Sequence, residues 1–161
     1  MKKIPSVLLI VLISLSLFLL TFLFVQTKNK TFVEDNTTDN LYLNNQNLKE
    51  LPDYVLSKTN LKTLDISNNN ISVTLPAEIK NLQNLKILNV SNNKMTNLPA
   101  EVGQLSKLEI LDLSNNQFTG LPYELGNLKN LKILNISGNN YSQKDLEIIK
   151  KSLPKTTEII L

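Results

Sequence analysis

Residues 85–95 read LKILNVSNNKM, and this stretch decides the fold because close copies of it recur along most of the chain. The other clear copies begin at Leu61, Leu108 and Leu131, so successive starts are 24, 23 and 23 residues apart. A weaker copy, TDNLYLNNQNL, occupies residues 38–48. A period of this length indicates a stack of similar units, each of which contacts its neighbours in the sequence.

The first half of each copy predicts a short β-strand. Apolar and polar residues alternate, so that Leu88 and Val90 point to one side and Asn89 to the other. A run this short buries little by itself, and parallel stacking of the units would bury a continuous apolar core.

The second half of each copy predicts an irregular or short helical segment. A Leu-Pro pair, such as Leu98-Pro99, precedes it each time, and proline ends the strand side because it cannot donate to a sheet. We expect Ile79, Val102 and Leu125 to point inward from these segments.

These features resemble the leucine-rich-repeat family, whose consensus is L-x-x-L-x-L-x-x-N-x-L. Four copies match all five marked positions, and the resemblance covers roughly residues 38–161. Units of 23 residues are similar to those of bacterial and intracellular signalling members. The resemblance implies an α/β leucine-rich-repeat solenoid of about five repeats. Its parallel β-sheet would line a concave face, with irregular or short-helical segments on the convex side.

One asparagine recurs in each repeat where the strand bends away. Its amide can both donate to and accept from turn backbone in its own and the neighbouring repeat, which would satisfy buried polar groups. We therefore predict a structural asparagine ladder made of Asn69, Asn93, Asn116 and Asn139.

The C-terminal end of the stack carries its own cap. Residues 142–145, Ser-Gln-Lys-Asp, are a helix N-cap signature, and Leu146, Ile149 and Leu153 then form an apolar stripe at helical spacing. A last short strand is expected over residues 158–161. The helix covers the final repeat in this interpretation; binding a partner is the less favoured alternative.

Ligands of this family usually bind on the concave face, and the resemblance assigns three outward rows of residues to it. The candidate partner-binding residues are Thr63, Asp65, Ile87, Asn89, Ile110, Asp112, Ile133 and Asn135. The isoleucines would form an exposed apolar stripe, which often marks an interaction site; alternatively, isoleucine is simply a good strand former there. We interpret the third row as structural consensus: Asn44, Ser67, Ser91, Ser114 and Ser137.

The first part of the chain predicts a membrane segment. Between Val7 and Val25 the only polar residues are Ser14, Ser16 and Thr21. As a helix these 19 residues would be roughly 28 Å long, close to the hydrocarbon thickness of a bilayer. An uncleaved signal anchor over residues 1–27 is favoured over a cleaved signal peptide, because the run is long and lacks small residues before a cut.

The lysines near the ends of that segment predict its orientation. Lys2, Lys3 and the terminal amine outweigh Lys28 and Lys30, so the N-terminus is expected in the cytoplasm and the repeats outside. A secreted protein, or repeats that face the cytoplasm, are the alternatives. Residues 28–37 are polar and are expected to form a spacer ahead of the repeat domain, residues 38–161.

Composition excludes several classes of chemistry. The chain has no Cys and no His, which removes thiolate nucleophiles, Ser-His-Asp chemistry and Cys/His metal sites, so no cofactor is expected. Residues 31–161 carry 13 Lys and 14 acids, a net charge of −1. Because lysines and acids are mixed along the chain and Arg is absent, we predict no nucleic-acid footprint.

Three functions remain open at this level. The favoured hypothesis is a non-catalytic, membrane-anchored module that binds a protein. A structural or adhesive envelope protein without one defined partner is the second. The third is an enzyme using Asp65 and Asp112, which would lie roughly 9–10 Å apart on strands two repeats apart. It is disfavoured because a flat sheet offers no cleft that would desolvate an acid.

Overall fold

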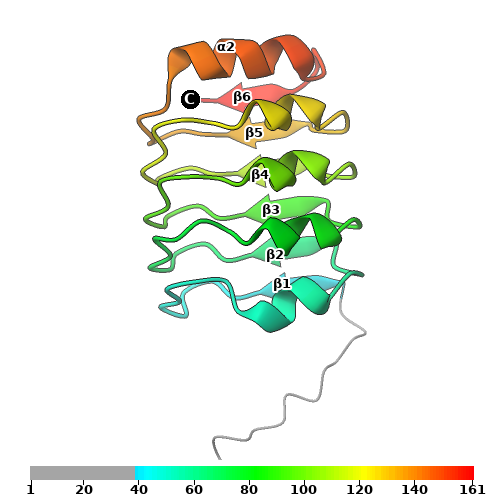
Figure 1. The fold of residues 1–161 in the computed structure, drawn as a ribbon, viewed down its shortest axis with the longest axis vertical. Coiled ribbons are helices and arrows are strands. Elements are labelled where there is room, and N and C mark those ends of the chain that lie inside the picture. Colours follow the sequence, from blue (N-terminus) through cyan, green and yellow to red (C-terminus); the bar gives the residue numbers. More distant parts are fainter. Residues whose placement is uncertain (1–38) are drawn as a thin grey trace, which may run out of the picture. The chain divides into compact units, whose positions relative to one another are not determined.

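The computed structural model describes residues 39–161, which form a regular stack of repeats (Figure 1). Six short strands build one parallel sheet in which each strand pairs with the next one along the chain. The strands are β1 (Asn40–Tyr42), β2 (Thr63–Asp65), β3 (Ile87–Asn89), β4 (Ile110–Asp112), β5 (Ile133–Asn135) and β6 (Glu158–Ile160). The expected parallel sheet is thus confirmed.

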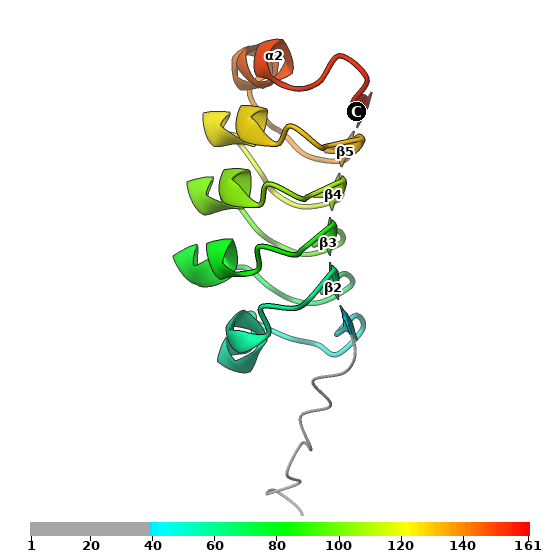
Figure 2. The same cartoon turned by 90° about the vertical axis from the view of Figure 1, so that its right-hand side faces the viewer.

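The side opposite the sheet is built from short helices, one per repeat, as Figure 2 shows. Four are 3-10 helices that follow the Leu-Pro pairs, and the proline is the N-cap residue of each. The helical segments are η1 (Asp53–Ser57), η2 (Ala77–Asn81), η3 (Ala100–Gln104), η4 (Tyr123–Asn127) and the α-helix α2 (Gln143–Ser152).

In the sheet, each residue pairs with the residue at the same position of the neighbouring repeat. Ile87 pairs with Ile110 and Ile110 with Ile133, while the leucine after each isoleucine pairs with its counterpart. Side chains at the same repeat position therefore form rows that run straight across the sheet.

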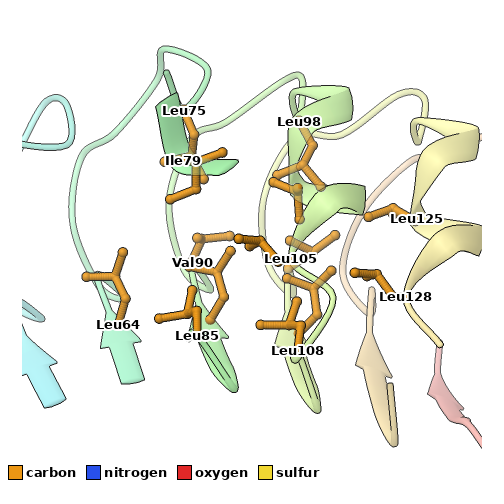
Figure 3. Packing of buried hydrophobic residues seen from close by; sticks show 14 of the residues in the cluster. Leu64, Leu75, Ile79, Leu85, Val90, Leu98, Leu105, Leu108, Leu125 and Leu128 are labelled. Atoms are coloured by element: carbon orange, nitrogen blue, oxygen red, sulfur yellow. The ribbon is translucent and has the colours of Figure 1, made fainter. Parts of the chain in front are cut away.

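The core fills the space between sheet and helices. Leu64, Leu88 and Leu111 point inward from the strands and are fully buried. Ile79, Val102 and Leu125 enter the same core from the helical side and are also fully buried, so these predicted inward positions are confirmed. Figure 3 shows Ile79 and Leu125 among the packed side chains. The apolar surface of one repeat is thus covered by the next one, as repeat stacking requires.

Two glycines let the last helices approach closely. A Cβ on Gly103 of η3 would lie 2.5 Å from the carbonyl carbon of Glu124 in η4. On Gly126 of η4 a Cβ would lie 2.6 Å from Cβ of Ser152 at the end of α2. The corresponding residue of η2 is Lys80, so this tight spacing belongs to the C-terminal repeats.

Helix α2 closes the C-terminal end of the stack. The Ser142 hydroxyl oxygen accepts a hydrogen bond from the Asp145 amide at 3.4 Å, which confirms the predicted N-cap. Leu146 and Ile149 are buried against the last repeat. The Tyr123 hydroxyl donates to the Asp145 carboxylate at 3.2 Å, and this charge raises the pKa of Tyr123. The helix is thus attached to η4 by polar as well as apolar contacts.

The predicted membrane segment (residues 1–27), the spacer (28–37) and Thr38 lie outside the described residues. Within residues 39–161 no helix is long and apolar enough to cross a membrane.

Candidate functional site

The outer side of the sheet carries the residues that the sequence proposed for partner binding. We call this surface the sheet face, and it consists of Thr63, Asp65, Ile87, Asn89, Ile110, Asp112, Ile133 and Asn135. Each of them is partly exposed, whereas the residue between each pair is buried. The structure therefore brings all eight onto one continuous surface.

An apolar row crosses this surface. Ile87, Ile110 and Ile133 are neighbours in the register, and Thr63 continues their row on β2. Adjacent strands lie roughly 4.8 Å apart, so the three isoleucines form a ridge about 10 Å long. Tyr42 on β1 and Ile160 on β6 stand at the two ends of the neighbouring row and add apolar surface there, with 60% and 39% of their surface exposed.

The second row of the sheet face is polar, and much of it is used inside the fold. The Asp65 carboxylate accepts the backbone N–H of Ser67 at 2.9 Å, and Asp112 accepts that of Ser114 at the same distance. Asn135 joins two strands, since its side-chain amide donates to Asp112 at 3.2 Å. These contacts hold the turn that follows each strand in place.

The same contacts bear on the alternative of acid–base catalysis. Asp65 and Asp112 lie on β2 and β4, separated by β3, and one oxygen of each carboxylate is committed to a turn amide. In addition, residues 39–161 contain no group of three His, Cys, Asp or Glu side chains able to hold a metal ion. The geometry assigns these two acids to turn formation.

The third row expected on the outer surface is only partly there, since Asn44 and Ser137 are partly exposed but the three serines between them are buried. Ser67, Ser91 and Ser114 are only 4–5% exposed. The strand has ended by this position, and the chain turns so that the serine lies under the preceding Asp or Asn side chain. The outward orientation expected for Ser67, Ser91 and Ser114 was wrong, because the period-two pattern of the strand does not continue into the turn.

The recurring asparagines hold neighbouring repeats together. The Asn93 side-chain amide donates to the carbonyl oxygens of Val90 in its own repeat and Ile66 in the preceding one, both at 3.0 Å. Its oxygen accepts the N–H of Ile71 at 3.0 Å. Equivalent bonds are made by Asn69, Asn116 and Asn139. Since Asn93 is 7% exposed, these backbone groups have little access to water.

A row of charges runs beside the sheet, where the chain enters the strands. Glu109 lies between Lys86, at 3.0 Å, and Lys132, at 2.6 Å, each from an adjacent repeat. The hydrogen bonds from Lys132 and Lys86 lower the pKa of Glu109 below its ordinary value. The carboxylate form is therefore favoured by folding.

We expect Glu109→Gln to destabilise the fold slightly at neutral pH, since its ion pairs lie at the surface, and to have no such effect in acid. Because the folded pKa is lowered, the stabilisation is present above the unfolded pKa and is lost as the pH falls through the folded value. Denaturant unfolding at pH 7 and at about pH 3 measures this. A difference between wild type and variant that persists in acid would show that packing, rather than charge, is responsible.

One surface was missed by sequence reasoning. We call it the entry edge: the loops from each helix into the next strand (residues 58–62, 82–86, 105–109, 128–132 and 153–157), with Asp39 ahead of β1. It carries seven lysines: Lys58, Lys62, Lys86, Lys107, Lys129, Lys132 and Lys155. Its acids are Asp39 and Glu109. Lysines and acids that alternate along the chain are thus separated in space. Alignment of the repeats by position would have revealed this clustering of lysines in the loops before the strands.

Comparison with known proteins places this geometry in a family. A family model described as a leucine-rich repeat region matches residues 40–159. No curated protein matches the chain significantly. Among solved structures, the LRR protein LIC12759 of Leptospira interrogans is 38% identical with a TM-score of 0.60, and the match covers 71% of this chain and 34% of that one.

Two plant receptor ectodomains from Arabidopsis thaliana are also similar. That of the receptor kinase SOBIR1 is 26% identical with a TM-score of 0.61, covering 74% of this chain and 65% of that one. That of GASSHO1/SCHENGEN3, solved in complex with CASPARIAN STRIP INTEGRITY FACTOR 2, is 31% identical with a TM-score of 0.58, covering 70% and 14%. This chain thus spans less than two thirds of each of these three proteins.

The repeats, the parallel sheet and the asparagine ladder agree with these matches. The leucine-rich-repeat fold is typically a non-enzymatic scaffold for interactions between proteins. The chain belongs to the leucine-rich-repeat family.

Proposed function

We propose that this chain is a non-catalytic binding module, anchored in a membrane by residues 1–27, that holds a protein partner on its sheet face. The observation that carries the proposal is the partly exposed ridge of Ile87, Ile110 and Ile133, aligned by the register of β3, β4 and β5. Apolar side chains in one continuous row offer a partner surface that can be removed from water.

The surroundings of the ridge suit protein recognition. Polar groups of Asp65, Asn89 and Asp112 lie beside it and are fixed by the turns that follow their strands. A rigid surface loses little conformational entropy on binding. The GASSHO1/SCHENGEN3 ectodomain, which shares these repeats, was solved in complex with its own partner.

The membrane part of the proposal rests on the sequence. The apolar run within residues 4–25 has the length of a single span, and the flanking lysines favour an N-terminus in the cytoplasm. Resistance of the full chain to extraction by carbonate tests the anchoring. Release into the supernatant would contradict it.

Substitution of the ridge tests the binding site. We expect Ile87→Thr/Ile110→Thr/Ile133→Thr to weaken partner binding roughly hundredfold, because each change removes about 1 kcal/mol of apolar burial. Threonine already occupies this row at Thr63 and keeps the β-branched shape of isoleucine. Tagged full-length protein in detergent is used to capture partners from envelope and cytosolic extracts, and the dissociation constant is then measured.

A matched variant extends the ridge instead of removing it. Thr63→Ile adds a fourth isoleucine to the row and is expected to retain or tighten binding. If the partner binds the triple variant as well as wild type, the sheet face is not the site. If no partner is captured from either extract, the alternative of a structural envelope protein is favoured.

A further inference from the structure

Charge is divided among the surfaces of the repeat stack. The strands carry the three acids Asp65, Asp112 and Glu158 and no lysine. The helical segments hold six acids and four lysines. The entry edge, with seven lysines and two acids, has a local charge of +5 although residues 39–161 together carry 13 lysines and 12 acids.

Most of these lysines are accessible. All except Lys58 are exposed, and Lys132 retains 70% of its side-chain surface. Their ion pairs with Glu109 and Asp39 lie at the surface, where such pairs contribute little and exchange readily for another anion. Lys129 differs, since its ammonium donates to the carbonyl oxygens of Gly126 and Ser152 and fastens α2 to η4.

The size and lining of the edge favour an extended anionic surface over a small ligand. A hollow of about 260 Å³ on this edge is lined by Lys86, Lys107, Glu109, Asn130 and Lys132. That volume is below the usual range for small-molecule sites, and Glu109 lies within it. The lysines recur in every repeat, so their charge extends along the whole stack.

The chain also enters the repeat stack at this edge. Asp39, the first described residue, pairs with Lys62 at 2.5 Å, directly ahead of β1. Figure 1 shows that all the strands start on the same side of the stack as β1. The first described residue of the chain therefore lies beside these lysines.

We propose that the entry edge docks on anionic phospholipid headgroups of the membrane that anchors the chain; this rests on the proposed anchoring by residues 1–27. Each lysine held near an anionic membrane strengthens binding roughly fivefold. Docked in this way, the strands point away from the bilayer. The sheet face stays open to a partner from the side.

Position-specific quenching tests the proposal on the full chain. Because the chain has no Cys, Ser106→Cys on the entry edge or Asn97→Cys, in the exposed loop after β3, gives a single site for a fluorophore. The labelled protein is reconstituted into vesicles of neutral phosphatidylcholine, with or without 30% phosphatidylglycerol by design, that also contain a nitroxide-headgroup lipid as a short-range quencher. We expect quenching at position 106 to rise at least twofold with the anionic lipid and to vanish in high salt, whereas position 97 stays unchanged.

Two lysine variants with equal net charge supply the control. Lys86→Gln/Lys107→Gln/Lys132→Gln/Lys155→Gln removes four charges from the entry edge and should abolish the added quenching. Lys80→Gln/Lys94→Gln/Lys144→Gln/Lys151→Gln removes four charges from other surfaces and should leave it intact. An equal effect of both variants, or equal quenching on neutral and anionic vesicles, overturns the proposal. So does binding of the entry edge to a single-stranded oligonucleotide without any response to anionic lipid.

Failure of the proposed membrane anchoring can be distinguished from failure of docking by the entry edge. A chain that carbonate extracts from vesicles is not anchored, and flotation with anionic or neutral vesicles at low salt then tests the entry edge directly. Flotation with anionic vesicles alone, lost in the entry-edge variant, supports docking without an anchor. No flotation with either vesicle overturns docking as well.

Discussion

Replacing Gly103 by alanine is expected to lower the free energy of unfolding by about 3 kcal/mol. The added Cβ would overlap the backbone carbonyl of Glu124, and its distance to the carbonyl carbon would be 2.5 Å. Because backbone atoms of η4 are involved, a change of rotamer cannot relieve the overlap. The two helices must move apart, which opens the core between Val102 and Leu125. Denaturant unfolding with a circular dichroism readout measures the loss.

Gly120 provides the matched control. A Cβ there would meet only an Asp145 side-chain oxygen, at 3.3 Å, and the backbone is not in the left-handed region. Gly120→Ala should therefore change the free energy of unfolding by no more than about 0.5 kcal/mol. Where no overlap exists, alanine in place of glycine is mildly stabilising. A stabilised Gly103→Ala protein would thus show that η3 and η4 are further apart than the structure places them.

Asn93→Ala is expected to lower the free energy of unfolding by about 2 kcal/mol, within the range for stranding a buried polar group. The substitution leaves the N–H of Ile71 without its partner. It also removes one of the two side-chain donors to each of the carbonyl oxygens of Ile66 and Val90, which keep the amides of the neighbouring ladder asparagines. These groups belong to two repeats, so the interface between the repeats weakens rather than one turn alone. The free energy of unfolding is the measurement.

Asn139 tests the role of burial in that prediction. It makes equivalent hydrogen bonds, to Leu113, Ile136 and Phe118, but it is only partly buried near the end of the stack. Water can replace some of the hydrogen bonds that Asn139→Ala removes. The free energy of unfolding should therefore fall clearly less than it does in Asn93→Ala. Equal losses at the two positions would contradict the idea that exclusion of water sets the cost.

The repeat pattern predicted most of the fold because the strands, the helical segments and the inward-pointing residues all recur with the same period as the sequence. Alignment of Ile87, Ile110 and Ile133 along the sequence already gives the sheet register, since parallel strands in a stack leave no freedom to shift. The N-cap at Ser142 was also predictable, because capping depends on local sequence.

The features that the sequence did not predict depend on how the chain turns after each strand and on how equivalent residues of different repeats come together. The serines after each strand alternate correctly with their neighbours, yet Ser91 is buried because the chain turns beneath Asn89. The entry edge was missed for a related reason. Net charge summed along the chain does not record that lysines such as Lys86 and Lys132 occupy the same position of different repeats.

The stepwise contacts of the repeat stack have a mechanical consequence. Within residues 39–161 each strand contacts only the strands next to it, and each helix only the helices next to it. Force applied to the C-terminal end would therefore break one interface at a time instead of shearing the whole sheet. After α2 and β6 detach, each further 23-residue unit would lengthen the chain by roughly 80 Å. Under load such a protein behaves as an extensible spring whose shortening, once the force is removed, proceeds from the surviving repeats.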